Sequence, residues 1–294
     1  MYLQHFGLRE APFGMSPDTA FFYPCSTMQE ALDTLRVAVG AGEGFIKITG
    51  EVGTGKSLLC RKLMASLDAR WLVAYLPNPD VQPLTLLQVL AERFEAPAAE
   101  QADQHVLLKL IHLALLRAAR DQKRVLVCLD EAQVTPDDTL ETLRLLTNLE
   151  TEKRKLLQVV LFGQPELDQR LRADSLRPLL QRISFSQQLH CLRRAELTHY
   201  VDYRLGIAGY SGPPLFAPAA YRALHRVSRG TPRIVNVLAN KALMLAYGEG
   251  VHRITARHIS LAAKDTPAAQ RGSRWPWWLL LISLFVALLW VLLQ

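Results

Sequence analysis

Short apolar runs alternate with longer segments of helical spacing along the first two thirds of the chain. The apolar runs predict buried strands at residues 45–49, 71–76, 125–130, 156–162 and 183–189. In the segments between them, apolar residues recur every three or four positions and predict helices near residues 28–39, 57–63, 84–94, 104–121 and 137–149. Because the apolar runs lack an alternating polar face, the strands should be buried on both sides. The pattern predicts an α/β fold, in which helices cover both faces of a parallel sheet.

The strand signal ends near residue 191, and helical spacing continues from there to about residue 264. This change predicts a second, smaller, all-helical domain after the sheet domain. The sequence thus predicts five segments, which are an aromatic-rich lead with one helix at 1–40, the α/β core at 41–191, the helical domain at 192–265, a linker at 266–274 and a membrane helix at 275–293.

The membrane helix is predicted from a run of 19 residues, Trp275 to Leu293, that contains no charged side chain. As a helix it would be about 28 Å long, which matches the hydrocarbon core of a bilayer. A buried core helix is the alternative, but it should show a polar face, which this run lacks. Arg271 and Arg274 stand before the run, and the positive-inside rule places that side in the cytoplasm. We therefore expect a single-pass membrane protein whose other domains are cytoplasmic.

The octapeptide after the first predicted strand matches G-x-x-x-x-G-K-[ST] at every fixed position. Its residues are Gly50, Glu51, Val52, Gly53, Thr54, Gly55, Lys56 and Ser57. A strand, a glycine-rich loop and a helix in this order indicate a P-loop, whose backbone N–H groups surround a phosphate. In this motif the lysine contacts the β- and γ-phosphates and the serine hydroxyl ligates Mg²⁺. A chance glycine turn is the alternative, but the filled positions and both flanks favour a site for ATP and Mg²⁺.

Two adjacent carboxylates, Asp130 and Glu131, end the third predicted strand, 74 residues after Lys56. Acidic residues often end strands, but after a P-loop this pair is typical of a Walker B motif. Asp130 would hold Mg²⁺ with Ser57, and Glu131 would accept a proton from the attacking water. P-loop kinases usually need no second carboxylate, so Glu131 favours an ATPase.

Further polar side chains are candidates for assisting hydrolysis. Gln164 follows the fourth predicted strand and could sense a γ-phosphate or the attacking water, although the same position suits an ordinary turn. Arg177 and Arg182 precede the fifth strand, and either could be an arginine finger or a solvated surface residue. Arg233 follows Pro232 at the predicted start of a helix and could reach over the phosphates.

The composition fits a globular protein and leaves its partner open. Half of the 294 residues are hydrophobic, 21% are charged, and the formal net charge is +7. This modest excess would suit either a nucleic acid or an anionic membrane. The four cysteines are scattered and form no C-x-x-C pair, which indicates a reducing compartment and not a disulfide framework.

Taken together, the motifs resemble the AAA+ ATPases of the family that includes ExeA and MshM, and within it the MshM branch. The resemblance extends over about residues 1–265 and includes segments 2–8 and 143–150. Its narrower motifs lie at 163–167, 180–183 and 230–233. It implies that Gln164 is the first sensor and Arg233 the second. It also implies that Arg182 is the finger, supplied in trans within a self-oligomer.

The resemblance implies an ATP-driven assembly factor at the bacterial inner membrane. Its partners would be other assembly proteins of a type IV (MSHA-like) pilus or a type II secretion apparatus. A nucleic-acid-dependent switch ATPase is one alternative, but a short linker and an apolar run stand where a DNA-binding module is expected, so we expect no nucleic acid. A nucleotide-binding membrane scaffold with little turnover is another, against which the intact Lys56, Asp130 and Glu131 count.

Overall fold

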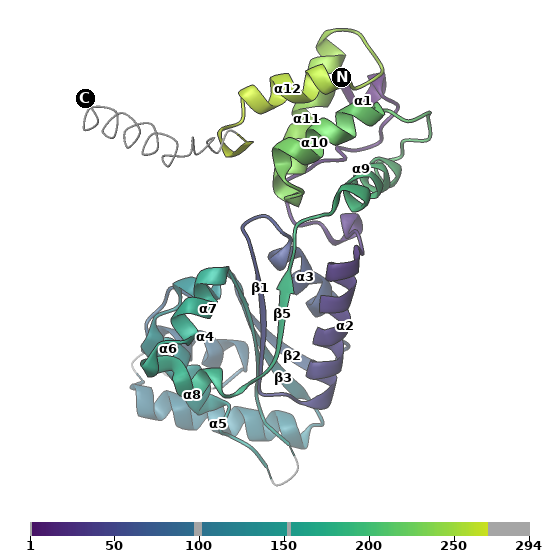
Figure 1. The fold of residues 1–294 in the computed structure, drawn as a ribbon. Coiled ribbons are helices and arrows are strands. Elements are labelled where there is room, and N and C mark those ends of the chain that lie inside the picture. Colours follow the sequence, from purple (N-terminus) through teal and green to yellow (C-terminus); the bar gives the residue numbers. More distant parts are fainter. Residues whose placement is uncertain (1, 97–101, 152–153, 270–294) are drawn as a thin grey trace, which may run out of the picture.

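The computed structural model describes residues 2–96, 102–151 and 154–269. Its centre is a five-stranded sheet whose order is β2-β3-β4-β1-β5, and every neighbouring pair is parallel (Figure 1). The strands are β1 Phe45–Gly50, β2 Trp71–Leu76, β3 Arg124–Leu129, β4 Gln158–Gly163 and β5 Ile183–Leu189. Because all five run the same way, their carboxyl ends share one edge of the sheet. The prediction of a parallel α/β sheet is confirmed.

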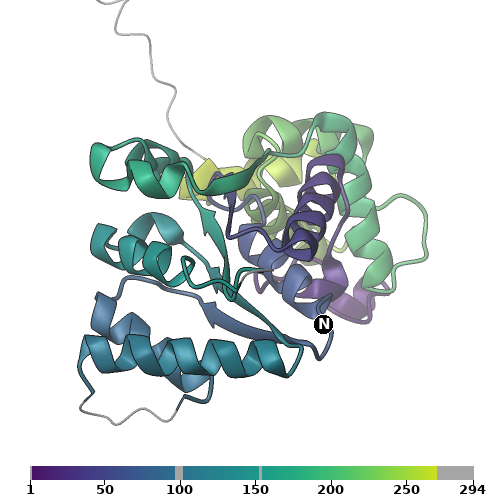
Figure 2. The ribbon, with the colours of Figure 1, turned by 90° about the horizontal axis from the view of Figure 1, so that it is seen from below.

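Helices cover both faces of this sheet, as Figure 2 shows from below. Side chains alternate between the faces along each strand, so Ile46 and Ile48 join one hydrophobic core while Phe45 joins the other. The first face is covered by α2 (Ser26–Ala41) and α3 (Lys56–Ala65). The second face is covered by α4 (Pro83–Arg93), α5 (Gln104–Arg120), α6 (Asp137–Leu146), α7 (Pro165–Leu171) and α8 (Arg177–Leu180).

One helix is shorter than its sequence pattern predicts. α6 ends at Leu146, three residues before the predicted end. Beyond it the N–H groups of Asn148 and Leu149 bond to the carbonyl oxygens three residues back, as in the tightened last turn of a helix. After the helix, Glu150 pairs with Lys155 in an isolated antiparallel bridge.

The second part of the chain is helical, as the sequence predicts, and lies beyond the carboxyl edge of the sheet (Figure 1). We call this part the lid. It consists of α9 (Arg194–Ile207), α10 (Pro218–Ser228), α11 (Pro232–Gly248) and α12 (Ala256–Lys264). Proline occupies the first turn of both α10 and α11, where its missing N–H costs no helical hydrogen bond.

The amino-terminal segment before α2, which we call the lead, packs against the lid. Its short helix α1 (Tyr2–His5) contacts α11, and the His5 ring stacks on His252 with 4.1 Å between the ring centroids. Further along, the Arg9 N–H donates to the Ala208 carbonyl oxygen at 2.8 Å. The phenylalanines of the lead are buried in the same core as the lid helices, namely Phe6, Phe13, Phe21 and Phe22.

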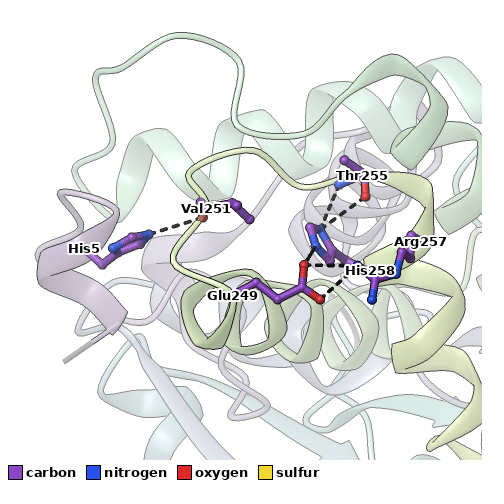
Figure 3. A network of polar contacts seen from close by, with 6 residues as sticks. All are labelled: His5, Glu249, Val251, Thr255, Arg257 and His258. Atoms are coloured by element: carbon purple, nitrogen blue, oxygen red, sulfur yellow. Dashed lines mark hydrogen bonds and ion pairs between the residues drawn. The ribbon is translucent and has the colours of Figure 1, made fainter.

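A network of polar side chains around the buried His258 holds the turn between α11 and α12 (Figure 3). His258 is 3% exposed, and its Nδ1 accepts the Thr255 N–H at 3.0 Å. Its Nε2 lies 3.1 Å from a carboxylate oxygen of Glu249, which also pairs with Arg257. The bond to His258, and more weakly the charge of Arg257, hold the pKa of Glu249 below its ordinary value. On the other side of this turn, His5 lies 3.2 Å from the Val251 carbonyl oxygen, so the turn also anchors the lead.

The predicted membrane helix at 275–293 lies outside the described residues. Among those that the structure describes, no helix is both long and apolar enough to cross a membrane.

Candidate functional site

The glycine-rich loop follows β1 at the carboxyl edge of the sheet. Gly53 and Gly55 have φ angles of 81° and 105°, a backbone conformation that side chains with a Cβ rarely adopt. Gly55 is also the residue directly before α3, so the N–H groups of that helix's first turn face the loop. The loop therefore has the form and position of a phosphate-binding loop.

Lys56 points back into this loop. Its ammonium group donates to the carbonyl oxygens of Gly50 at 2.8 Å and Glu51 at 3.2 Å. Burial lowers the pKa of Lys56, and the carboxylates of Glu131 and Asp130 partly offset this effect. The lysine thus lies where a bound phosphate would replace the two carbonyl oxygens as the partner of its charge.

Asp130 comes directly after β3 and is buried beside the loop. Its carboxylate accepts the N–H of Glu131 at 3.1 Å and the hydroxyl of Tyr75 at 3.3 Å. Burial raises the pKa of Asp130, while an interaction with the Ser57 hydroxyl lowers it. The two residues that the sequence predicts as Mg²⁺ ligands therefore lie together.

Glu131 is held in place by two amide groups. One oxygen, Oε2, accepts from the side chain of Gln133 at 2.6 Å and from that of Gln164 at 2.9 Å. Burial acts to raise the pKa of Glu131, but these two bonds and the charge of Lys56 outweigh it, so the pKa lies below its ordinary value. Glu131 also has a φ of 55°, which is unusual for a residue other than glycine.

Gln133 is a site residue for which the sequence predicts no role of its own. Besides binding Glu131, its side-chain oxygen accepts the backbone N–H of Gln164 at 2.9 Å. Its own carbonyl oxygen accepts from Arg170, which also pairs with Asp137 at the start of α6. The available signal was its place two residues after the predicted Walker B glutamate, but no local pattern indicates which way its amide points.

The lid contacts the P-loop at Arg233. Its backbone N–H donates to the Gly53 carbonyl oxygen at 3.2 Å. A Cβ on Gly53 would lie 2.6 Å from the Arg233 Cβ, so only glycine permits this approach. The lid turns toward the loop at Gly230, where a Cβ would lie 2.0 Å from the Leu192 carbonyl oxygen.

These elements enclose a cavity of about 310 Å³, which we call the nucleotide cavity. The lead contributes Gly14 to Asp18, the loop contributes Lys56 and Ser57, and Glu131 lines the cavity from the sheet. The lid contributes Tyr200, Arg204, Pro232, Arg233 and Asn236. A smaller apolar recess adjoins the cavity and shares Tyr200 and Pro232 with it. Tyr200, Arg204 and Asn236 lie in lid helices whose apolar spacing predicts only that they are helical.

Neither candidate finger reaches this cavity. Arg182 precedes β5, whose first residue Ile183 pairs with Phe45 at the start of β1, the end of that strand away from the P-loop. There Arg182 lines a separate cavity of about 360 Å³. Arg177 is exposed at the start of α8. The structure therefore brings together every predicted site residue except the finger.

Comparison with known proteins agrees with this fold. Residues 39–171 match the AAA domain family. One solved structure of similar fold is Cdc6p from Pyrobaculum aerophilum, with a TM-score of 0.63 and 16% identity; the match covers 84% of this chain and 70% of that one. Another is the RuvB Holliday junction branch migration motor of Thermotoga maritima, with a TM-score of 0.55 and 15% identity; the match covers 81% of this chain and 67% of that one. At such identities the likeness shows the fold alone.

The fold and the P-loop agree with the family match over residues 39–171, and an AAA domain implies ATP binding. More particularly, the chain is related to general secretion pathway protein A of Aeromonas hydrophila, with 42% identity over 275 residues. The alignment covers 94% of this chain and 50% of the relative, so the chain spans about half the length of that protein.

Proposed function

We propose that this chain hydrolyses ATP with Mg²⁺ in the nucleotide cavity. The observation that carries the proposal is the convergence of Lys56, Asp130, Glu131 and Gln164 at one edge of the sheet, facing Arg233 of the lid. A scaffold that only binds nucleotide has no need of an ionised glutamate that two amide groups hold beside its P-loop lysine.

Mg²⁺ would be held by Ser57 and Asp130. A hydroxyl and a carboxylate are oxygen ligands of the kind that Mg²⁺ prefers, and the two side chains already interact in the structure. When bound, the ion would neutralise charge on the β- and γ-phosphates. Lys56 would contact the same phosphates, and Arg233 would approach them from the lid.

Glu131 would accept the proton of the attacking water. Its lowered pKa keeps the carboxylate ionised at neutral pH, which a base requires. The side-chain amides of Gln133 and Gln164 both donate to Oε2, so Oε1 is the oxygen that would face the water. In this arrangement Gln164 acts as the first sensor through Glu131, because movement of its amide displaces the base.

The adenine ring of the nucleotide would lie in the apolar recess beside the cavity. Phe21 and Tyr23 of the lead, Met28 of α2 and Tyr200 of the lid line this recess. Aromatic and thioether groups suit the flat, polarisable face of a purine.

The cellular role that we propose is assembly of a type II secretion apparatus or a type IV, MSHA-like pilus. The relationship to general secretion pathway protein A supports the first, and the motif resemblance to the MshM branch supports the second. In either case the chain would act from the bacterial inner membrane, through the apolar run at 275–293, with other assembly proteins as partners.

We propose that Arg182 completes the site of a neighbouring copy. It lies away from the nucleotide cavity of its own chain, as a finger supplied in trans must. The active species would then be a self-oligomer.

A nucleic-acid-dependent ATPase is the second candidate. Residues 192–265 contain 11 Lys and Arg against 4 Asp and Glu, so the lid carries an excess of positive charge. Stimulation of ATP turnover by double-stranded DNA, lost at high salt, would favour this candidate over the assembly factor.

The proposal is tested with the full chain purified in detergent. The parent should release phosphate from ATP only with Mg²⁺. The Lys56→Ala variant should bind ATP more weakly, because it loses the charge that faces the phosphates. Tight binding without measurable phosphate release by the parent would support the scaffold instead.

A further inference from the structure

The lid buries a positive charge that has no carboxylate partner among the described residues. Arg204 of α9 is 5% exposed, although arginine is rarely buried unless it is paired. Its Nε donates to the Pro12 carbonyl oxygen at 2.6 Å, and its Nη1 donates to the Tyr200 hydroxyl at 3.2 Å. The guanidinium group also stacks over the Phe21 ring, 4.6 Å from its centroid.

These contacts leave part of the group's hydrogen-bonding capacity unused. A guanidinium has five N–H donors, and the two bonds to Pro12 and Tyr200 engage two of them. Arg204 lines the nucleotide cavity, where the lining carboxylates are those of Asp18 and Glu131. Asp18 accepts the N–H of Ala20, and Glu131 accepts from the two glutamine amides. A buried cation without a counterion is costly, and an anion in the cavity would remove that cost.

The bond to Pro12 connects the same side chain to the lead. Pro12 stands just before the segment Gly14 to Asp18, which forms one wall of the nucleotide cavity. Arg204 therefore contacts the lead on one side and the cavity on the other. A change in the environment of its charge acts directly on the group that holds this wall.

We propose that Arg204 couples the binding of a nucleoside di- or triphosphate to the docking of the lead on the lid. The negative charge of the nucleotide balances the buried guanidinium, which strengthens the hold of Arg204 on Pro12 and closes the lead over the cavity. Arg204 acts as a positioning residue, and this role rests on the proposed nucleotide site. No motif marks it, because Arg204 lies inside a helix, 192 residues from its partner Pro12.

A purely structural role makes a different prediction, and Arg204→Met separates the two. Methionine keeps the apolar stem and can still pack against Phe21, but it carries no charge. If Arg204 only packs and bonds, the variant should melt at a lower temperature with and without nucleotide. If Arg204 couples to nucleotide, the rise in melting temperature that nucleotide gives the parent should be much smaller in the variant, whatever the variant's melting temperature without nucleotide.

The experiment uses the full chain in detergent, with ADP as the probe and Arg226→Met, in an exposed position of α10, as the matched control. Coupling predicts that Arg204→Met binds ADP about tenfold more weakly, the scale of one charged hydrogen bond. It also predicts that ADP slows hydrogen exchange of residues 9–22 in the parent and control but not in Arg204→Met. Unchanged ADP affinity, or unchanged protection of residues 9–22, in Arg204→Met would overturn the coupling.

Should the methionine variant fail to fold, Arg204→Lys provides the same readouts. Lysine keeps the charge but lacks the planar fork that bonds Pro12 and Tyr200 while stacking on Phe21. Coupling predicts weaker ADP binding and reduced protection of residues 9–22, and parental values would overturn it. If the parent itself binds no ADP, the proposed function fails and the coupling fails with it, whereas a defect confined to the variants bears on Arg204 alone.

Discussion

The side-chain amide of Gln164 donates to Oε2 of Glu131 at 2.9 Å, which ties the end of β4 to the end of β3. A water or phosphate that draws Gln164 away would change both the position and the basicity of Glu131. The next two predictions concern the role and the basicity of Glu131.

Glu131→Gln should keep ATP binding but slow turnover by about a hundredfold or more, the scale of losing a positioned base. The glutamine has nearly the same shape and leaves Lys56 and Ser57 in place. Single-turnover phosphate release and a separate ATP titration measure the two effects. Glu92→Gln, at an exposed position of α4, serves as the control and should match the parent. A parental rate in Glu131→Gln would mean that another group is the base.

Gln133→Ala should shift the acidic limb of the pH–rate profile to higher pH. The hydrogen bond from the side-chain amide of Gln133 lowers the pKa of Glu131, so its loss raises that pKa. A base is active only when ionised, and activity is therefore lost earlier as the pH falls. The profile of kcat between pH 4 and 8 measures the shift. The opposite shift, or none, would show that Gln133 does not set the basicity of Glu131.

Gly53→Ala should weaken the contact between loop and lid. The alanine Cβ would meet the Arg233 Cβ at 2.6 Å, and the φ of 81° disfavours alanine by about 1 kcal/mol or more. We expect a lower melting temperature and weaker ATP binding. Gly206→Ala, inside α9 with open space around the new Cβ, should raise stability by about 0.5–1 kcal/mol. Thermal unfolding of the two variants with and without ATP checks both directions.

Arg182→Ala should lose ATP hydrolysis while its affinity for ATP largely survives, because a finger acts on the transition state. Arg177→Ala is the matched control and should remain active. Mixing Arg182→Ala with Lys56→Ala protein should partly restore turnover, since some interfaces would pair an intact loop with an intact finger. A rate per chain that stays constant on dilution to demonstrable monomers would exclude an arginine supplied by a neighbour.

The full chain should stay with the membrane when bacterial membranes are washed with carbonate, and a chain ending at Gly272 should be released. The reason is the uncharged run of 19 residues at 275–293, flanked by Arg271 and Arg274. Immunoblots of the pellet and supernatant measure this. Recovery of the full chain in the supernatant would contradict a membrane span.

Local patterns predicted much of the fold because the deciding information is itself local. The apolar run from Phe45 and the glycines after it identify a strand and a P-loop without reference to distant residues. Asp130 could be placed beside Ser57 because parallel strands end at a common edge. The predicted strand 183–189 matches β5 from end to end.

Contacts between distant segments could not be predicted in the same way. The bonds from Arg204 to Pro12 and from Gln133 to Gln164 depend on how the lead, the lid and the loop after β3 come together in space. Neither periodicity nor composition records those arrangements. The end of α6 was misplaced for a smaller reason. The apolar spacing continues to Leu149, but the backbone hydrogen bonds tighten after Leu146.

The left-handed backbone of Glu131 sets the hydrolysis proposed for this residue against thermostability. An L-residue with a Cβ gives up about 1 kcal/mol or more in this conformation, whereas glycine does not. A laboratory selection for heat resistance alone should therefore enrich glycine at position 131 and yield robust but inactive proteins. In natural populations the carboxylate would persist only while ATP turnover is itself under selection. Replacement of Glu131 in a lineage would therefore mark the point at which hydrolysis was no longer selected.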